Sequence, residues 1–475
     1  MNSTDVIKVN KVFNSFEELF KQIQINDGMT ISFHHHLREG DNVMFQVLKS
    51  IQKIGVKGVT LACTSLMNTH DFIADMLGDG TVSKIQTSGL KGKLACMALS
   101  GEMPEPVIFR SHGSRARAVS DGELKVDIAF IAASAADIFG NANALDGPSA
   151  FGSLGYGVWE AKNAKKTVIV TDYLSQSILR DISISQSYTD AVMIVPSIGN
   201  TAGVKAGSLK EKGNPRDSVI ASNVANTIIN CGMELDQSGI QMGSGSVSLQ
   251  VGRHLNGYMK ERGKKFKFGL GGITQDLIDM LNDGTVDSLL DVQSFDPKAC
   301  YSIKNNKNHH EIDVNTYANP LNKSSAVNFL DIAVLSATEI DTDWNVNVLT
   351  GSDGSIIGAI GGHQDVAAAS KITIIAAPLF RNRIGVIRKK VNTVVTPGEN
   401  VDILVTDFGI AVKESRQDII KSLTDKGIKV LKIEDLYKKC ISFTSEPRTI
   451  SFTDKVAGIV QAPDGKVQDY IYKKV

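Results

Sequence analysis

"ADMLGDGTV" (74–82) occurs again as "IDMLNDGTV" (278–286), 204 residues further along the chain. The same spacing aligns "DIAFIAASAADIFGNANALDG" (127–147) with "DIAVLSATEIDTDWNVNVLTG" (331–351), where nine of the 21 positions are identical. Segments that recur at one constant spacing indicate an internal repeat. The sequence therefore predicts a chain made of two copies of one folding unit.

Each copy has the pattern of an α/β unit. Short apolar runs such as "KTVIVT" (166–171) and "ITIIAA" (372–377) alternate with helical patterns such as "NVMFQVLKSIQKIG" (42–55). Continuous apolar runs are typical of strands that are covered on both faces, as in parallel sheets. We expect two duplicated domains with open, largely parallel sheets, facing each other across a cleft that holds the site.

The boundary between the two copies is expected in the polar stretch "SLKEKGNPRDS" (208–218). We therefore predict an N-terminal domain over residues 1–215 and a C-terminal domain over residues 216–475.

Composition excludes several classes of function. Of the 475 residues, 42% are hydrophobic and 21% are charged, and 51 basic residues balance 51 acidic ones. A net charge of zero gives no general attraction to nucleic acid or to anionic membranes. No apolar run approaches the roughly 20 residues that cross a bilayer. Five scattered cysteines without a CxxC pair, and the lack of a signal peptide at the N-terminus, predict a cytoplasmic protein.

The stretch "TISFHHHLREGDNV" (30–43) concentrates histidines and an arginine after an apolar run. Three interpretations are open: a metal site, a solvent-exposed loop, and one wall of an anion site. A metal is disfavoured because no HExxH motif and no neighbouring ligand set is present. Consecutive side chains fan out, so at most one or two of the histidines are expected to face one ligand.

A second basic stretch, "RSHGSRARA" (110–118), is either a solvated loop or a further part of an anion site. If the stretch is extended, Arg115 and Arg117 lie on the same side of the backbone. Arginine suits carboxylates because its planar fork donates to both oxygens.

Glycine-rich segments follow in the second half: "MGSGSVSLQVG" (242–252), "GLGGI" (269–273) and "GAIGGHQD" (358–365). Glycine lets backbone N–H groups approach an anion or a developing oxyanion. None fits a dinucleotide fingerprint. The asparagines paired by the repeat, Asn141/Asn345 and Asn143/Asn347, are interpreted as turn caps.

The order of "GMTISFHHHLREGD", "RSHGSRARA", "GSGSVSLQVGRHL" and "GAIGGHQDVAAASKITII" resembles the α subunits of bacterial citrate lyases, over essentially the whole chain. These subunits are related to the CoA-transferases and share their duplicated fold. The resemblance implies a citrate:acetyl-carrier-protein transferase, which exchanges acetate for citrate on a carrier thioester. A separate β subunit would then split the citryl thioester.

The implied partners are the β subunit, the acyl carrier (γ) subunit, citrate and acetate, with further copies of the chain in the complex. No tightly bound cofactor and no metal is expected in this chain. A CoA-derived prosthetic group belongs to the carrier. We expect no nucleic acid and no membrane as partners.

The predicted site residues fall into three groups. The catalytic group is His35, Gly271 and Gly272. The substrate-binding group is His34, His36, Arg38, Arg110, His112, Arg115 and Arg117. The group expected to bind CoA or the carrier arm is Gly243, Ser244, Gly245, Ser246, Gly269, Asn345, Gly361 and Gly362.

One departure from the related enzymes bears on mechanism. Many CoA-transferases carry a Ser-Glu-Asn-Gly turn whose glutamate forms a covalent acyl-enzyme, and here Leu270 and Gly271 stand in that place. Direct exchange between bound substrates is therefore expected. A covalent CoA-transferase or thioester hydrolase that uses Glu39 or Glu160, and a non-catalytic scaffold subunit, remain as alternatives.

Overall fold

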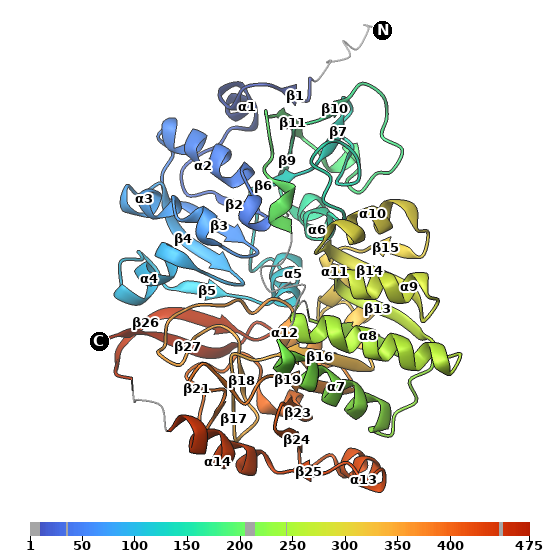
Figure 1. The fold of residues 1–475 in the computed structure, drawn as a ribbon. Helices are drawn as coiled ribbons and strands as arrows, with labels where there is room; N and C mark the ends of the chain where they lie inside the picture. Colours follow the sequence, from blue (N-terminus) through green and yellow to red (C-terminus); the bar gives the residue numbers. More distant parts are fainter. Residues whose placement is uncertain (1–9, 35–36, 205–213, 244, 446–449) are drawn as a thin grey trace, which may run out of the picture.

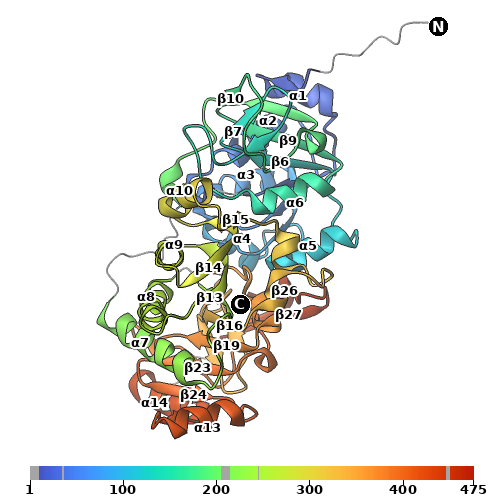
Figure 2. The same cartoon turned by 90° about the vertical axis from the view of Figure 1, so that its right-hand side faces the viewer.

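The computed structural model describes residues 10–34, 37–204, 214–243, 245–445 and 450–475. Two large sheets with helices packed around them form the molecule (Figure 1). Seen from the side, the first half of the chain lies above the second (Figure 2). This confirms the predicted α/β class with large, mostly parallel sheets.

The first sheet has ten strands, which are parallel except for its last pair. Their order across the sheet is β1 (Val12–Phe13), β11 (Ala191–Ile194), β9 (Lys166–Thr171), β6 (Ile128–Ala132), β2 (Thr30–Phe33), β3 (Val59–Cys63), β4 (Val82–Thr87), β5 (Val107–Phe109), β26 (Phe452–Gln461) and β27 (Val467–Lys474).

The second sheet has nine strands, with β23 and β24 as its antiparallel pair. Their order is β15 (His309–Glu311), β14 (Val286–Ser294), β13 (Phe266–Ile273), β12 (Gly239–Met242), β16 (Ile332–Ser336), β19 (Ile372–Ala376), β23 (Ile403–Thr406), β24 (Gly409–Val412) and β25 (Val430–Leu431).

The same order of seven strands occurs in both sheets. Strands β11-β9-β6-β2-β3-β4-β5 of the first correspond to β23-β19-β16-β12-β13-β14-β15 of the second. The repeated segment 127–147 covers β6, β7 (Ala135–Asp137) and β8 (Ala142–Asn143). Its copy 331–351 covers β16, β17 (Glu339–Asp341) and β18 (Val346–Asn347). Equal sequence spacing thus corresponds to equal topology.

Three small sheets lie beside the large ones: β10 (Leu174–Ser175) with β7 and β8, β22 (Ile387–Arg388) with β17 and β18, and β20 (Phe380–Arg381) with β21 (Ile384–Gly385). Of the repeated asparagines, Asn143 and Asn347 cap turns there, as predicted, whereas Asn141 and Asn345 accept from the distant N–H groups of Gln186 and Gly398. Asn143 Oδ1 accepts from the N–H groups of Leu145 and Asp146, and Asn347 Oδ1 accepts from those of Leu349 and Thr350.

Helices of the first half are α1 (Phe16–Ile23), α2 (Val43–Lys53), α3 (Ile73–Gly78), α4 (Gly92–Ser100), α5 (His112–Ser120) and α6 (Gly155–Asn163). Those of the second half are α7 (Pro215–Asn230), α8 (Ser246–Glu261), α9 (Gln275–Asn282), α10 (Pro297–Asn305), α11 (Val314–Ala318), α12 (His363–Ala369), α13 (Gln417–Asp425) and α14 (Ile433–Thr444). Among the described residues no helix has the length and apolarity needed to cross a bilayer.

The end of the chain does not follow the predicted division at residue 215. Strand β26 pairs with β5, so the last hairpin extends the first sheet (Figure 1). Val460 and Ile471 of this hairpin are buried in the core of the first half. Without the hairpin β5 would be an edge strand with unpaired backbone groups, which β26 satisfies. Residues 208–213 of the expected linker lie outside the described residues, and 214–218 begin α7.

The two halves of the chain also pack against each other. The first core includes Leu349, Ile356 and Ile360 from the second half. An isolated bridge joins Gly89 to Ala359. Helices α5 and α6 of the first half contact α11 of the second. These contacts fix the ends of first-half strands against second-half segments.

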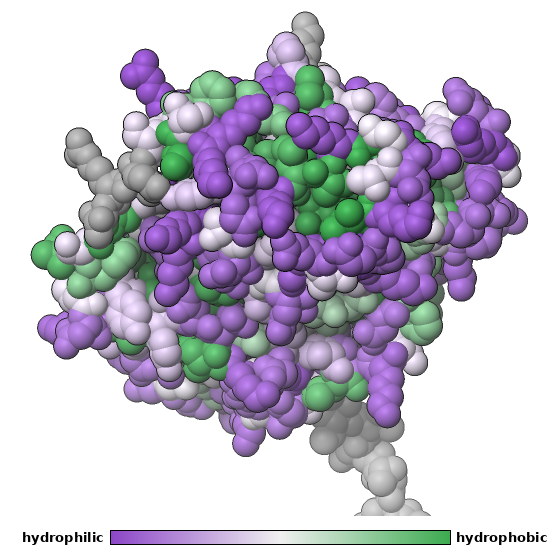
Figure 3. All heavy atoms as spheres, turned by 90° about the horizontal axis from the view of Figure 1, so that it is seen from below, coloured by the Kyte–Doolittle hydropathy of each residue, from purple (hydrophilic) through white to green (hydrophobic). Residues whose placement is uncertain are grey.

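The face seen from below carries an apolar area surrounded by hydrophilic side chains (Figure 3). At the same lower end of the molecule lie α14 and β21 (Figure 1). The rings of Phe380, Phe408 and Phe443 contact one another there. Phe443 and Ile384 are exposed.

Candidate active site

A cavity of about 260 Å³ lies where the two halves meet. Its walls come from the start of α5 and α6 in the first half, and from β12, β13, β14, β16 and the start of α12 in the second. It is lined by His112, Tyr156, Gln241, Met242, Gly243, Gly272, Val292, Gln293, Phe295, Tyr317, Leu335, Ser336, Val348, Ala359, Ile360, Gly361, Gly362 and His363.

Two of the predicted histidines meet on one tyrosine. His34 follows the end of β2 and its ring stacks on that of Tyr156, with 4.3 Å between centroids. The ring of His112, the first residue of α5, lies 4.6 Å from the same tyrosine ring. Burial lowers the pKa of His112 to about 3, and the charge of Arg115 adds to this. His112 is therefore neutral at neutral pH.

Arg38 lies against a residue of the cavity wall. Its guanidinium carbon lies 5.1 Å from the centroid of Phe295, a residue of the other half that lines the cavity. Arg38 has a φ of 56°, a left-handed conformation that costs a non-glycine residue about 1–2 kcal/mol. Within the described part of the chain, its guanidinium has neither an ion-pair partner nor a hydrogen-bond acceptor, and burial lowers its pKa.

The other three predicted arginines are neutralised internally. Arg115 pairs with Glu160, at 2.5 Å between Nη2 and Oε1, and also donates to Ser32 and to the carbonyl of Ala62. Arg110 donates to Glu123 at 2.7 Å, and to Gln461 and Gln86.

Arg117 pairs with Asp121 and Glu123. The stretch that holds these arginines is helix α5 rather than an extended segment. The condition under which Arg115 and Arg117 would share one side is therefore not met, since residues two apart in a helix lie about 200° apart around its axis.

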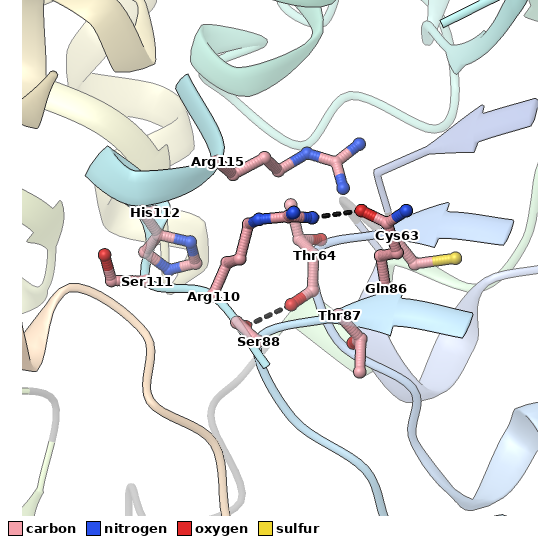
Figure 4. A pocket seen from close by; sticks show the side chains of 9 residues that line it. All are labelled: Cys63, Thr64, Gln86, Thr87, Ser88, Arg110, Ser111, His112 and Arg115. Atoms are coloured by element: carbon pink, nitrogen blue, oxygen red, sulfur yellow. Dashed lines mark hydrogen bonds between the residues drawn. The ribbon is translucent and has the colours of Figure 1, made fainter. Parts of the chain in front are cut away.

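A second, much smaller pocket shares His112 with the first and has room for about one water molecule. Figure 4 shows a hydrogen bond from Arg110 to Gln86 and another from Ser88 to the carbonyl of Thr64. Arg115 and His112 line the same pocket. His112 lines both pockets. Because their partners are already in place, Arg110 and Arg115 shape this pocket rather than supply an unbalanced charge.

The glycines of "GLGGI" are part of strand β13, not of a turn. Gly271 has a φ of 108°, and the pairing of β13 with β14 shifts register between Gly271 and Gly272. Only glycine adopts this conformation at low cost. At Gly272, a Cβ would lie 1.9 Å from the ring of Phe295. Gly269 packs against Leu277 and Leu289, and so has a structural role.

The remaining glycine segments lie around the cavity. Gly243 lines it, Gly245 caps α8, and Ser246 donates to Asp217 at the start of that helix. Gly361 and Gly362 line it before α12. Asn345 does not line it, because its amide is engaged with Asp341 and the N–H of Gly398. His35, His36 and Ser244 lie outside the described residues.

Asp365 links the two halves at the start of α5. One carboxylate oxygen accepts from Ser111 Oγ at 2.6 Å and the other from the N–H of Gly113 at 2.9 Å. The carbonyl of Gly361 accepts from the N–H of His112. Burial raises the pKa of Asp365 to about 7. Second-half residues thus hold His112 in its place.

Several side chains of the cavity were not predicted from the sequence. Tyr156, Gln241, Gln293, Phe295 and Tyr317 belong to none of the quoted motifs, and His363 lies in "GAIGGHQD" but was not singled out there. Both ring nitrogens of His363 form hydrogen bonds, one with Thr396 and one with the carbonyl of Ser336. Burial lowers the pKa of His363 to about 4. Among the described residues, no cluster of three or more histidine, cysteine or acidic side chains is able to hold a metal ion.

Comparisons with known proteins identify the family of the chain. The family model "Citrate lyase, alpha subunit (CitF)" matches residues 9–474. The citrate lyase alpha chain of Escherichia coli K12 is 43% identical over 98% of this chain and 91% of the relative. That of Klebsiella pneumoniae is 41% identical over 97% of this chain and 91% of the relative.

Solved structures give the same result. The α subunit of citrate lyase from Streptococcus mutans, in complex with citrate, has a TM-score of 0.96 at 41% identity, covering 99% of this chain and 92% of that one. A Pseudomonas malonate decarboxylase structure shares the fold alone, with a TM-score of 0.69 at 13% identity over 92% of this chain and 91% of that one. The chain therefore belongs to the family of citrate lyase α subunits, the transferase component of citrate lyase.

Proposed function

We propose that the cavity between the two halves is where this transferase exchanges acetate for citrate on the thioester of a carrier. The two halves would then be copies of one unit that face each other across the cleft, as the sequence repeat predicts. The main support for this assignment is the state of Arg38. It is a partly buried guanidinium without an ion-pair partner among the described residues, stacked on a ring that lines the cavity.

Citrate is mostly a trianion near neutral pH, so its site needs cations or oriented donors. Arg38 would take one carboxylate by its planar fork. The neutral His112 would contribute hydrogen bonds rather than charge. Tyr317, Gln241 and Gln293 would supply further polar contacts along the walls.

The exchange needs no acid–base residue. A citrate carboxylate is ionised and attacks the acetyl thioester carbonyl, which gives a tetrahedral oxyanion and then a mixed anhydride and a thiolate. The thiolate attacks the citryl carbonyl of the anhydride, and acetate leaves. Backbone N–H groups at Gly271 and Gly272, on the irregular part of β13, would stabilise the oxyanions.

A covalent route finds no support at the cavity. Among the described residues that line it there is no aspartate or glutamate. Glu160, one of the two alternative nucleophiles, is already ion-paired with Arg115 and accepts a hydrogen bond from Ser32. Glu39, the other, is exposed next to Arg38.

The carrier arm is proposed to enter beside Gly243 and Gly361, where the cavity wall is backbone rather than side chain. The carrier would bring its CoA-derived group, and the β subunit would take the citryl product. Further copies of this chain are proposed in the complex. Five free cysteines fit the proposed cytoplasmic location.

The test uses the purified chain with acetyl-CoA, or with acetylated carrier protein, and isotopically labelled citrate. Mass spectrometry should find the citryl thioester and free acetate without oxaloacetate. Absence of both products with either thioester would favour the scaffold alternative. A stable acyl-glutamate trapped by hydroxylamine would favour the covalent one.

Arg38→Ala should weaken citrate binding about 10- to 100-fold, the range for a charged hydrogen bond. Arg262→Ala is the matched control, because Arg262 also stacks on an aromatic ring, but that ring, Tyr258, does not line the cavity. Its kinetics should equal those of the wild type.

A further inference from the structure

Tyr156 is the second residue of helix α6 and belongs to the first half, yet most of the residues that line the cavity with it belong to the second half. Gly155 makes this possible. A Cβ there would lie 2.4 Å from the carbonyl oxygen of Ile312 and 2.5 Å from that of Val292. Because glycine has no Cβ, the start of α6 approaches the second sheet and brings Tyr156 to the cavity.

The ring of Tyr156 is fixed from two sides. His34 stacks on it at an interplanar angle of 28°, and His112 lies against it at 58°. The residue is only 4% exposed, so the ring has little freedom to turn away. Such aromatic contacts hold a ring in place beyond what its buried area alone provides. His34 and His112, two of the histidines predicted to bind substrate, thus contact this tyrosine.

The hydroxyl of Tyr156 is available for a ligand. No described residue makes a hydrogen bond to it, whereas Tyr317, on the same cavity, accepts from Gln241 at 3.0 Å. Burial holds the pKa of Tyr156 well above its ordinary value. The hydroxyl is therefore protonated at neutral pH and is a hydrogen-bond donor.

We propose that Tyr156 is a catalytic residue whose hydroxyl donates a hydrogen bond to the thioester carbonyl oxygen as that oxygen becomes an oxyanion. This inference rests on the proposed exchange reaction. When the citrate carboxylate attacks, a C–O bond forms and the carbonyl electron pair moves to the oxygen beside Tyr156. The C–S bond then breaks and the thiolate leaves. On return, a C–S bond forms, the second oxyanion accepts the same hydrogen bond, and acetate leaves. The proton stays on Tyr156 throughout.

The test is Tyr156→Phe, which keeps the ring between the two histidines and removes only the hydroxyl. One oxyanion donor is commonly worth about 100- to 1000-fold in kcat, and we expect a loss in that range. The KM values for citrate and for the acetyl thioester should change less than about threefold. The melting temperature should stay within about 1 °C of the wild type. Tyr188→Phe, at an exposed tyrosine, is the control and should exchange at the wild-type rate.

The kcat effect separates catalysis from packing. A kcat within about threefold of the wild type would overturn the proposal, and so would a loss confined to the KM for citrate. If the wild-type chain itself performs no exchange, the proposed function fails. If the wild type exchanges and Tyr156→Phe matches it, only the role of Tyr156 fails.

Discussion

The ion pair between Arg115 and Glu160 gives the sharpest test of which arginines bind substrate. Glu160 Oε1 accepts from Nε of Arg115 at 3.0 Å and from its Nη2 at 2.5 Å, and Nη2 also donates to Ser32 and Ala62 at 3.2 and 3.0 Å. The residues are 8% and 3% exposed. A guanidinium with this set of acceptors is part of the fold, so Arg115 is not expected to bind citrate.

Glu160→Ala leaves that guanidinium buried without its counter-charge, which typically costs about 3–5 kcal/mol. Its unfolding in urea, followed by circular dichroism, should lose stability by this amount. The double variant Arg115→Met, Glu160→Met removes both charges and fills similar volume, so it should recover most of the loss. Glu17→Ala breaks an exposed pair with Lys21 and should cost no more than about 0.5 kcal/mol.

The kinetics of the folded variants complete the experiment. At a temperature where Glu160→Ala is folded, its KM for citrate should equal the wild-type value. An unchanged unfolding midpoint together with a tenfold higher KM for citrate would refute the reasoning, because Arg115 would then be serving the ligand.

Three further predictions follow from the site and the fold. Arg38→Ala should raise the KM for citrate without lowering the melting temperature, and a well-folded variant with unchanged citrate kinetics would remove Arg38 from the site. Gly271→Val should abolish exchange while calorimetry still detects citrate binding, because a side chain at φ 108° distorts β13 beside Gln241. Burial raises the pKa of Asp276 to about 7, so the native state keeps a proton there that the unfolded chain releases near pH 4. The wild type should therefore lose about 2–3 kcal/mol more stability than Asp276→Asn between pH 5 and pH 8, and equal losses would contradict this.

Several features of the site were predictable from local sequence. The glycines of "GLGGI" and "GAIGG" indicated close backbone approach, and Gly271, Gly272 and Gly361 do lie at the irregular strand and the cavity wall. Local sequence could not tell which arginines bind substrate and which are paired within the fold. Arg38 and Arg115 carry the same group, and their difference depends on Glu160, which is 45 residues from Arg115 in the chain. Tyr156 lacked any signal, because a tyrosine in a short helix has no pattern that distinguishes a site from a core.

The sequence by itself determined the repeat, the α/β class with mostly parallel sheets, and the family, because each depends on the identity and spacing of residues along the chain. Tertiary structure alone decided which charges are balanced, which half the last hairpin joins and which side chains line the cavity. These depend on contacts between residues far apart in sequence: Arg115 with Glu160, β26 with β5, and Tyr156 with His34 and His112. An ionised group is neutralised by whatever lies within a few ångströms of it, and only the folded chain sets those distances.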